Sequence, residues 1–410
     1  METSLYIHIP FCRKKCDYCD FYSIPSTKRK VDGKSLENDL TDSYVEAVLN
    51  EVAFYAELYG ISSWKTVYVG GGTPSLLSAS QLARLFSGIK EIAPFSCGYE
   101  ATVEMNPDDV RDDFIAACKN SGVNRLSLGI QALDDNALES VHRGCSASAA
   151  LKAIEYLDSS WNGRLSVDFI AGLPNQTYAS FKNQFEKVFA LKKIDHISLY
   201  TLTIEENTPL GKKIDSGKLD FSFERADKMW LIGRNILEKN GFMQYEVSNF
   251  SKPGFESMHN STYWKLENYI GCGVGASGTW YGKNLDDDFA CRWTNTLSVP
   301  AYVDFWNDLQ DKNEDSLLRS CEIIDRKTLE FEFLMMGFRM RKGVYAEDFE
   351  KRFGKSILDF ENSSCRKFAD IFSEWKKNRL ASTKKDSSGE RYFLNRRGIL
   401  LLNMFLEELL

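Results

Sequence analysis

Apolar residues recur along this chain with two different spacings. Short alternating runs, such as the one over residues 5–9, predict β-strands, and apolar residues spaced as they are over 42–59 predict amphipathic helices. Strands are predicted over 5–9, 65–69, 100–105, 125–129, 166–170 and 196–203. Helices are predicted between them over 42–59, 79–92, 108–120, 149–157 and 178–191, with one more ending near Leu138.

Strands and helices that alternate every roughly thirty residues indicate βαβ units and a parallel sheet. Such units fit a barrel or a doubly wound sheet, and periodicity does not separate the two. Chemically distinctive residues fall in or just after successive strands, namely Cys12, Gly71, Glu104, Gln131 and Asp168. Since strand ends converge at one mouth of a barrel, their placing favours an α/β fold with a partial six-unit, TIM-like barrel.

The rest of the chain reads as more helical. A helix is predicted over 223–239, a short strand over 244–247 and a surface loop over 23–41. Beyond Leu317 the pattern is helical and charged, with a hairpin near 386–393 that turns at Gly389 and a terminal helix from Arg397. We therefore expect a barrel domain over 1–312 and a smaller α-rich, winged-helix-like domain over 313–410.

Charge and composition narrow the class of protein. The hydrophobic fraction is 43% and the net charge is −7, which offers no general attraction to nucleic acid. Residues 341–410 carry 15 basic and 11 acidic side chains, an excess of positive charge. Such an excess usually marks only a solvated face, and the less favoured interpretation is a peripheral membrane contact. No secretory signal begins the chain and the apolar run 399–405 is too short to span a bilayer. We expect a cytoplasmic location.

Three cysteines follow the first strand on one short loop. Cys12, Cys16 and Cys19 lie just after Pro10 in a C-x3-C-x2-C spacing, which supplies three soft ligands. A structural zinc ion would want a fourth ligand, and none lies nearby in the sequence. Three thiolates on a four-iron cluster would leave one iron open to another ligand.

The cysteine loop and several later phrases together resemble the radical S-adenosylmethionine (SAM) superfamily. Within it the chain is similar to the coproporphyrinogen-dehydrogenase-like branch and to the HemW haem chaperones. The matching phrases lie at 6–19, 69–77, 104–107, 124–131, 168–177, 205–210, 245–250 and 259–264.

The resemblance implies a [4Fe–4S] cluster on Cys12, Cys16 and Cys19, with SAM on the fourth iron. The reduced cluster would then cleave SAM to a 5′-deoxyadenosyl radical. It also implies SAM contacts from Tyr6, Tyr18, Gly71, Gly72, Thr73, Glu104, Gln131, Arg143 and Asp168. The competing readings are a plain turn for the glycines, a salt bridge for Glu104, and ordinary packing for the others.

Two further positions bear on function. Phe21 stands where the coproporphyrinogen dehydrogenases carry a further cysteine, and phenylalanine can neither bind metal nor donate a proton. The H-N-S-T-Y-W phrase matches the haem chaperones. An exposed His259 imidazole could bind haem iron, with Tyr263 and Trp264 beside the porphyrin. The alternative is a capping or buried structural histidine.

These observations predict a haem-binding and haem-transfer chaperone on a cluster-and-SAM scaffold. Haem would be its cargo, and apo-haemoproteins would receive it. The alternative function is oxygen-independent oxidation of coproporphyrinogen III.

Overall fold

The computed structural model describes residues 1–410 except 26–29, 32–33, 283–288 and 309–311. Its main feature is a 12-stranded sheet in the order β11-β12-β10-β9-β8-β7-β6-β1-β13-β14-β15-β16. The six predicted strands form most of its parallel part, to which β13 adds a further parallel strand beside β1. They are β1 (Glu2–Ile9), β6 (Ser63–Gly71), β7 (Phe95–Met105), β8 (Arg125–Gln131), β9 (Arg164–Ala171) and β10 (Ile194–Thr201).

Strand order decides between a barrel and a doubly wound sheet. From β1 to β10 the parallel strands lie side by side in the order of the sequence, with no reversal. A doubly wound sheet reverses its order at a switch point. The sheet also continues beyond β1 to β13 and beyond β10 to β12, so β1 and β10 are not neighbours. The predicted partial barrel is confirmed.

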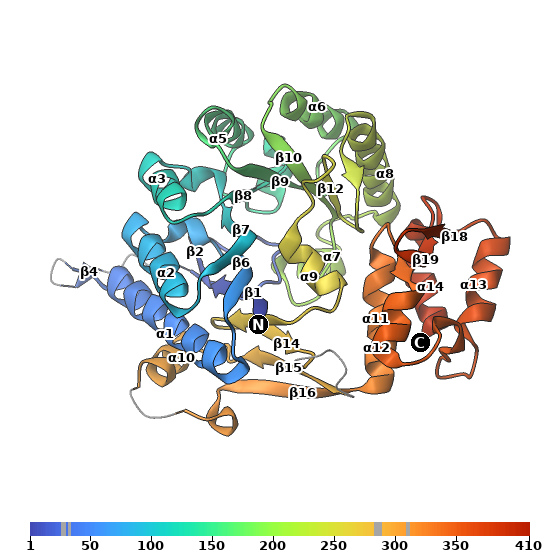
Figure 1. Ribbon diagram of the computed structural model, residues 1–410. Coiled ribbons are helices and arrows are strands. Elements are labelled where there is room, and N and C mark those ends of the chain that lie inside the picture. Colours follow the sequence, from blue (N-terminus) through green and yellow to red (C-terminus); the bar gives the residue numbers. More distant parts are fainter. Residues whose placement is uncertain (26–29, 32–33, 283–288, 309–311) are drawn as a thin grey trace.

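Helices surround the outside of the barrel (Figure 1). They bury apolar faces against the strands, and a large hydrophobic core lies between them. These helices are α1 (Leu36–Tyr59), α2 (Ala79–Ile92), α3 (Asp112–Asn120), α5 (Ala147–Ser160), α6 (Tyr178–Phe189) and α8 (Phe223–Lys239). Two shorter helices, α4 (Asp135–Ser140) and α7 (Pro209–Asp215), pack in a separate small hydrophobic cluster.

The segments that follow extend both ends of the sheet. They comprise β11 (Met243–Gln244), β12 (Asn249–Ser251), α9 (Met258–Trp264), β13 (Tyr269–Cys272), β14 (Ser277–Trp280), β15 (Phe289–Asn295), α10 (Val299–Asn307) and β16 (Arg319–Asp325). Short pieces elsewhere are β2 (Phe11–Cys12), β3 (Ile24–Pro25), β4 (Lys30–Val31), β5 (Lys34–Ser35), η1 (Pro74–Leu76), η2 (Pro107–Asp109) and η3 (Glu314–Ser316).

A second hydrophobic core holds the C-terminal module, which lies beside the barrel (Figure 1). Its three-stranded sheet has the order β17-β19-β18, and the predicted hairpin turns at Gly389, whose φ is +123°. Its elements are α11 (Arg326–Arg339), β17 (Val344–Tyr345), α12 (Ala346–Phe353), η4 (Ile357–Asp359), α13 (Phe368–Lys377), β18 (Ala381–Asp386), β19 (Gly389–Leu394), η5 (Gly398–Leu401) and α14 (Leu402–Leu409). The predicted boundary between 312 and 313 stays a prediction.

Some local predictions differ from the structure, among them the helical pattern after Leu317, where residues Arg319–Asp325 form strand β16. Helix α1 begins at Leu36 rather than at 42. Leu36 and Leu40 continue the four-residue spacing towards Tyr44, but the polar residues around them led to the prediction of a loop. Part of the loop expected over 23–41 lies outside the described residues. Strand β11 is shorter than the predicted 244–247 and ends at Gln244. Among the described residues, no helix is long and apolar enough to cross a membrane.

Candidate functional site

A cleft of about 530 Å³ opens at the C-terminal ends of the parallel strands. Cys19 and Phe21 contribute to its wall, and Phe21 is 68% exposed. Eight of the nine residues expected to contact SAM also line it: Tyr18, Gly71, Gly72, Thr73, Glu104, Gln131, Arg143 and Asp168. They come from distant parts of the sequence and meet because successive parallel strands end at one rim.

The three cysteines lie beside this cleft and are all partly exposed. The Cys12 Sγ lies 3.4 Å from the Thr73 Oγ1, and an Arg143 Nη1 lies 3.6 Å from the Cys16 Sγ. Among the described residues, no three His, Cys, Asp or Glu side chains are placed to hold a single metal ion. A four-iron cluster makes a different demand, because its thiolates bind different irons.

Asn106 joins these two cysteine contacts, although the sequence analysis did not select it. Its amide nitrogen donates to the Thr73 Oγ1 (3.2 Å), and its amide oxygen accepts from an Arg143 Nη2 (2.8 Å). Arg143 also donates to the backbone oxygen of Gly129 (2.5 Å). The side chains behind Cys12 and Cys16 are thus linked by one amide. The E-M-N-P phrase was the signal that could have identified Asn106.

The glycine segment packs directly under the cysteine loop. A Cβ on Gly72 would lie 2.8 Å from the backbone oxygens of Ile9 and Phe11, and its own N–H donates to the Ile9 oxygen (2.7 Å). Gly71 has a φ of +108°, and a Cβ there would meet the His8 ring at 2.6 Å. Both positions therefore need glycine to let β6 approach the chain that leads into the cysteines.

Glu104 is a carboxylate at the end of β7 that faces the cleft. It accepts hydrogen bonds from the Tyr68 hydroxyl (2.6 Å) and the Gly71 N–H (3.2 Å). Burial raises the pKa of Glu104 to about 7, and the Tyr68 hydrogen bond opposes that rise. The salt bridge considered from sequence is absent from the described contacts of this side chain. A cation bound in the cleft would favour its charged form.

Gln131 and Asp168 complete the far wall of the cleft. Gln131 has a φ of +67°, a left-handed conformation that is uncommon for a residue with a side chain. Asp168 accepts from the Ser127 hydroxyl at 3.1 Å, and burial raises its pKa. Two carboxylates and an amide therefore face the space next to Arg143.

Tyr6 is the one expected SAM contact that does not line the cleft. Its hydroxyl is hydrogen-bonded to the His8 Nδ1 (3.0 Å), and its ring lies 6.2 Å from the Tyr68 ring. Tyr18, by contrast, lines the cleft and packs on the small core under the cysteine loop. Of the two tyrosines, only Tyr18 is placed to touch a ligand in the cleft.

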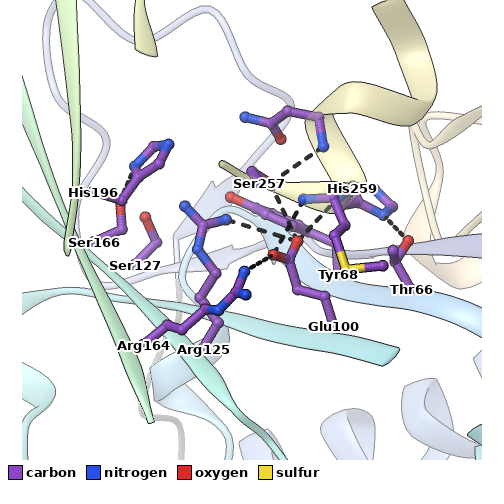
Figure 2. Close-up of polar contacts among 12 residues, drawn as sticks. Thr66, Tyr68, Glu100, Arg125, Ser127, Arg164, Ser166, His196, Ser257 and His259 are labelled. Carbon is purple, nitrogen blue, oxygen red and sulfur yellow. Dashed lines mark hydrogen bonds and ion pairs between the residues drawn. The ribbon is translucent and has the colours of Figure 1, made fainter. Parts of the chain in front are cut away.

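The structure places His259 inside the protein, on α9, so the expectation of an exposed imidazole was wrong. The residue is 1% exposed, and both ring nitrogens have partners. Nδ1 meets the Thr66 Oγ1 at 2.6 Å (Figure 2), and Nε2 meets the Tyr263 hydroxyl at 2.7 Å. The ring also stacks on Tyr68 with centroids 5.0 Å apart. Burial lowers the pKa of His259 to about 3, so its ring is neutral at pH 7.

Glu100 holds the start of α9 in place (Figure 2). Its carboxylate accepts from the Ser257 hydroxyl (3.2 Å) and from the backbone N–H groups of Met258 (3.2 Å) and His259 (3.0 Å). Arg125 and Arg164 lie 3.9 and 3.6 Å from its oxygens. A carboxylate at a helix N-terminus satisfies free N–H groups and complements the helix dipole.

The other two aromatic residues of the H-N-S-T-Y-W phrase also pack inward. Tyr263 meets Tyr269 edge to face with centroids 4.7 Å apart. Trp264 carries the Arg339 guanidinium over its ring at 5.5 Å, and its indole N–H is buried without a partner among the described residues. Neither residue lines the cleft. The phrase thus joins the barrel to α11.

Asp17 ties the cysteine loop to the barrel. Its Oδ2 lies 2.7 Å from the His142 Nδ1 and 2.5 Å from the Lys213 Nζ, so one carboxylate bridges two elements. Its backbone N–H donates to the Val141 oxygen and its oxygen accepts from the Leu210 N–H. Burial alone would raise the pKa of Asp17, but the bonds from Lys213 and His142 outweigh it and lower the pKa.

Comparison with known proteins identifies the scaffold. Family models of the Radical SAM superfamily and of the HemN C-terminal domain match residues 6–188 and 324–370. The heme chaperone HemW of Lactococcus lactis is 35% identical over 86% of this chain and 85% of the relative, and that of Bacillus subtilis is 32% identical over 86% and 88%.

Two further proteins support the same scaffold. The mouse mitochondrial radical S-adenosyl methionine domain-containing protein 1 is 38% identical over 84% of this chain and 74% of the relative. The structure of Escherichia coli coproporphyrinogen III oxidase (HemN) superposes with a TM-score of 0.74 at 20% identity, covering 99% of this chain and 89% of that one. At this identity the superposition shows a shared fold.

Proposed function

We propose that this chain, which belongs to the HemW family within the radical SAM superfamily, binds haem and delivers it to apo-haemoproteins. The observation that carries this proposal is identity of 35% to a heme chaperone HemW along 86% of the chain. Phe21 supports it further, because the side chain at this wall of the cleft cannot take part in proton or metal chemistry.

The radical SAM family implies a [4Fe–4S] cluster and SAM, and we propose Cys12, Cys16 and Cys19 as the cluster ligands. Three partly exposed thiols beside an open cleft suit a cluster that must also meet a second ligand. When bound, the reduced cluster supplies the electron that can cleave SAM. Arg143 would lie against the cluster and stabilise its negative charge, since it already contacts the Cys16 Sγ.

We propose that the cleft residues hold SAM. Glu104 and Asp168 can accept from amine or hydroxyl donors, and their burial makes an added hydrogen bond or cation strongly stabilising. The Thr73 hydroxyl and Gln131 supply further polar groups. Tyr6 is expected to act only by packing behind Tyr68, because its hydroxyl is bonded to His8.

Removing the Asp17 bridge is expected to weaken cluster binding more than folding. In Asp17→Ala and Lys213→Met, iron and acid-labile sulfide per chain should fall to about half or less, because the cysteine loop loses a contact to α7. Lys213 is partly exposed, so the loss of folding stability should stay near 1 kcal/mol. Iron analysis and melting of the cluster-free protein measure the two effects separately.

Lys228→Met is the matched control. It breaks another lysine–carboxylate pair, 2.6 Å long and fully on the surface, with Glu224. Its iron content and melting temperature should equal those of the wild type. Wild-type iron content in Asp17→Ala would contradict a positioning role for the bridge.

We propose His259 as the axial haem ligand only in a state in which α9 has moved. Both of its nitrogens are engaged and the side chain is buried, so haem iron needs the Thr66 and Tyr263 hydrogen bonds to break first. Of the four histidines, His8 and His196 are also buried and hydrogen-bonded at both nitrogens. The His142 side chain is 50% exposed and is the alternative imidazole.

Haemin titration of the cluster-reconstituted protein tests both the function and the ligand. We expect a Soret shift in the wild type, no shift in His259→Ala and an unchanged shift in His142→Ala. Iron content and circular dichroism of each sample report whether the cluster and the fold survive. A shift that is lost only in His142→Ala would place the ligand on His142. Absence of any shift in the wild type would overturn the haem-binding proposal.

The same sample tests the second candidate function, anaerobic oxidation of coproporphyrinogen III, which the fold shared with HemN supports. Conversion of that substrate in the presence of SAM and reductant would make the protein an enzyme despite Phe21.

We further propose a barrel unit over 1–312 and a C-terminal unit over 313–410 that serves partner contact. We also propose a cytoplasmic location and a peripheral membrane contact.

A further inference from the structure

Two cysteines outside the cluster loop lie side by side on the sheet surface. Cys291 on β15 and Cys321 on β16 have their Sγ atoms 2.8 Å apart. In the antiparallel register Cys321 lies opposite Trp293, two residues from Cys291, so both thiols point to the same face. A disulfide bond would need the sulfurs to approach by only roughly 0.8 Å.

The surroundings of the two sulfurs differ. Strand β16 is the last strand of the large sheet and most of it is exposed. Cys321 is exposed, whereas Cys291 is partly buried. Burial and the contact with Cys321 raise the pKa of Cys291 to about 12. A molecule in solution therefore reaches the Cys321 thiol first, because the Cys291 sulfur is less accessible.

An arginine and a tryptophan side chain lie on the same face of the sheet as the two thiols. Arg319, two residues before Cys321 on the same face of β16, lies 5.1 Å over the Trp293 ring and donates to the Tyr55 hydroxyl at 2.8 Å. Its positive charge opposes the rise in the pKa of Cys291. A held guanidinium next to a thiol pair stabilises a thiolate as it forms.

We propose that Cys291 and Cys321 form a reversible dithiol–disulfide site that reacts with small-molecule disulfides such as glutathione disulfide. The Cys321 thiolate attacks one sulfur of the reagent, and the other half leaves as a thiol. The Cys291 sulfur then attacks the Cys321 sulfur and displaces the second half as a thiol. The protein loses two electrons and two protons, and the reagent gains them.

A disulfide bond between Cys291 and Cys321 would hold the edge strand β16 on the sheet, just before the C-terminal module begins. Strand β16 runs directly into α11, whose first turn is capped by the Asp325 side chain through the Thr328 N–H. Cross-linking β16 to β15 restricts the unfolded chain and holds this junction. The melting temperature of the oxidised protein should therefore exceed that of the reduced protein. This inference is independent of haem binding.

The test uses the full chain with its cluster reconstituted, so that the three loop cysteines are occupied. The protein is equilibrated anaerobically in glutathione buffers of increasing oxidation, quenched with acid, alkylated and mapped by peptide mass spectrometry. We expect the Cys291 and Cys321 peptides to become joined, with a mass loss of about 2 Da that dithiothreitol reverses. Cys97 and Cys365, both exposed, should carry only mixed disulfides.

Single variants test the order of attack. Cys291→Ser should leave Cys321 trapped as a mixed disulfide with glutathione, and Cys321→Ser should leave Cys291 largely unmodified. Cys97→Ser is the matched control and should not change the cross-link. Separately alkylated Cys291 and Cys321 in the most oxidising buffer would overturn the proposal, and this wild-type result does not depend on how the variants fold.

Discussion

Replacing Cys16 by serine is expected to remove nearly all iron from the reconstituted protein, together with the broad visible absorption of the cluster. A serine oxygen is a harder and weaker ligand for iron than a thiolate, and two remaining thiolates do not hold a four-iron cluster. Of the three cysteines, Cys16 gives the clearest test of cluster binding. Arg143 lies 3.6 Å from its sulfur, so serine at this position would also disturb the guanidinium.

Cys145→Ser serves as the control for this prediction. Cys145 lies on the same loop as Arg143 but is 6% exposed and donates to the Ser146 oxygen. Its iron content should match that of the wild type. The measurements are iron per chain, acid-labile sulfide and the visible spectrum under argon. A Cys16→Ser protein that keeps a full complement of iron would place the cluster elsewhere.

Replacing Glu100 by alanine is expected to destabilise the fold by about 3–5 kcal/mol. The carboxylate is 2% exposed and serves three donors of α9, and its loss leaves Arg125 buried without its nearby carboxylate. Glu100→Gln keeps one acceptor oxygen and should lose less stability than the alanine variant. The midpoint of urea unfolding, followed by fluorescence and circular dichroism, measures the effect.

Glu46→Ala is the matched control for Glu100. It removes a carboxylate that also binds an arginine, Arg84, at 2.7 Å, but on the surface, where such a pair contributes about 1 kcal/mol or less. Equal urea midpoints for Glu100→Ala and Glu46→Ala would show that the anchor on α9 contributes little to stability.

The Glu100 contacts to α9 also bear on haem binding. The H-N-S-T-Y-W phrase predicted an exposed haem ligand, but its helix is held by Glu100 and its histidine is buried against Tyr68. Haem binding through His259 would therefore be coupled to release of α9, and the coupling makes the haem titration of His259→Ala and His142→Ala decisive for the ligand.

Much of the fold and of the cleft was accessible from sequence because it rests on local pattern. Alternating and helical periods identified the six parallel strands and most of the helices around them, and successive strand ends placed Gly71, Glu104, Gln131 and Asp168 at one rim. The C-x3-C-x2-C spacing indicated which side chains could share a cluster. The family resemblance also identified Phe21 as a position at which the coproporphyrinogen dehydrogenases carry a further cysteine.

Other features depend on packing between residues far apart in the chain, which no local pattern encodes. His259 reads the same in the sequence whether it is exposed or buried, and only the position of α9 against β6 and β7 decides that it is buried. Asp17, Asn106 and the Cys291–Cys321 pair likewise acquire their roles from partners on other elements. The sequence by itself determined the alternating strands and helices and, through the family resemblance, the expectation of a cluster and SAM. The tertiary structure decided which side chains remain free to meet a ligand, because burial and hydrogen bonding arise only when distant segments pack together.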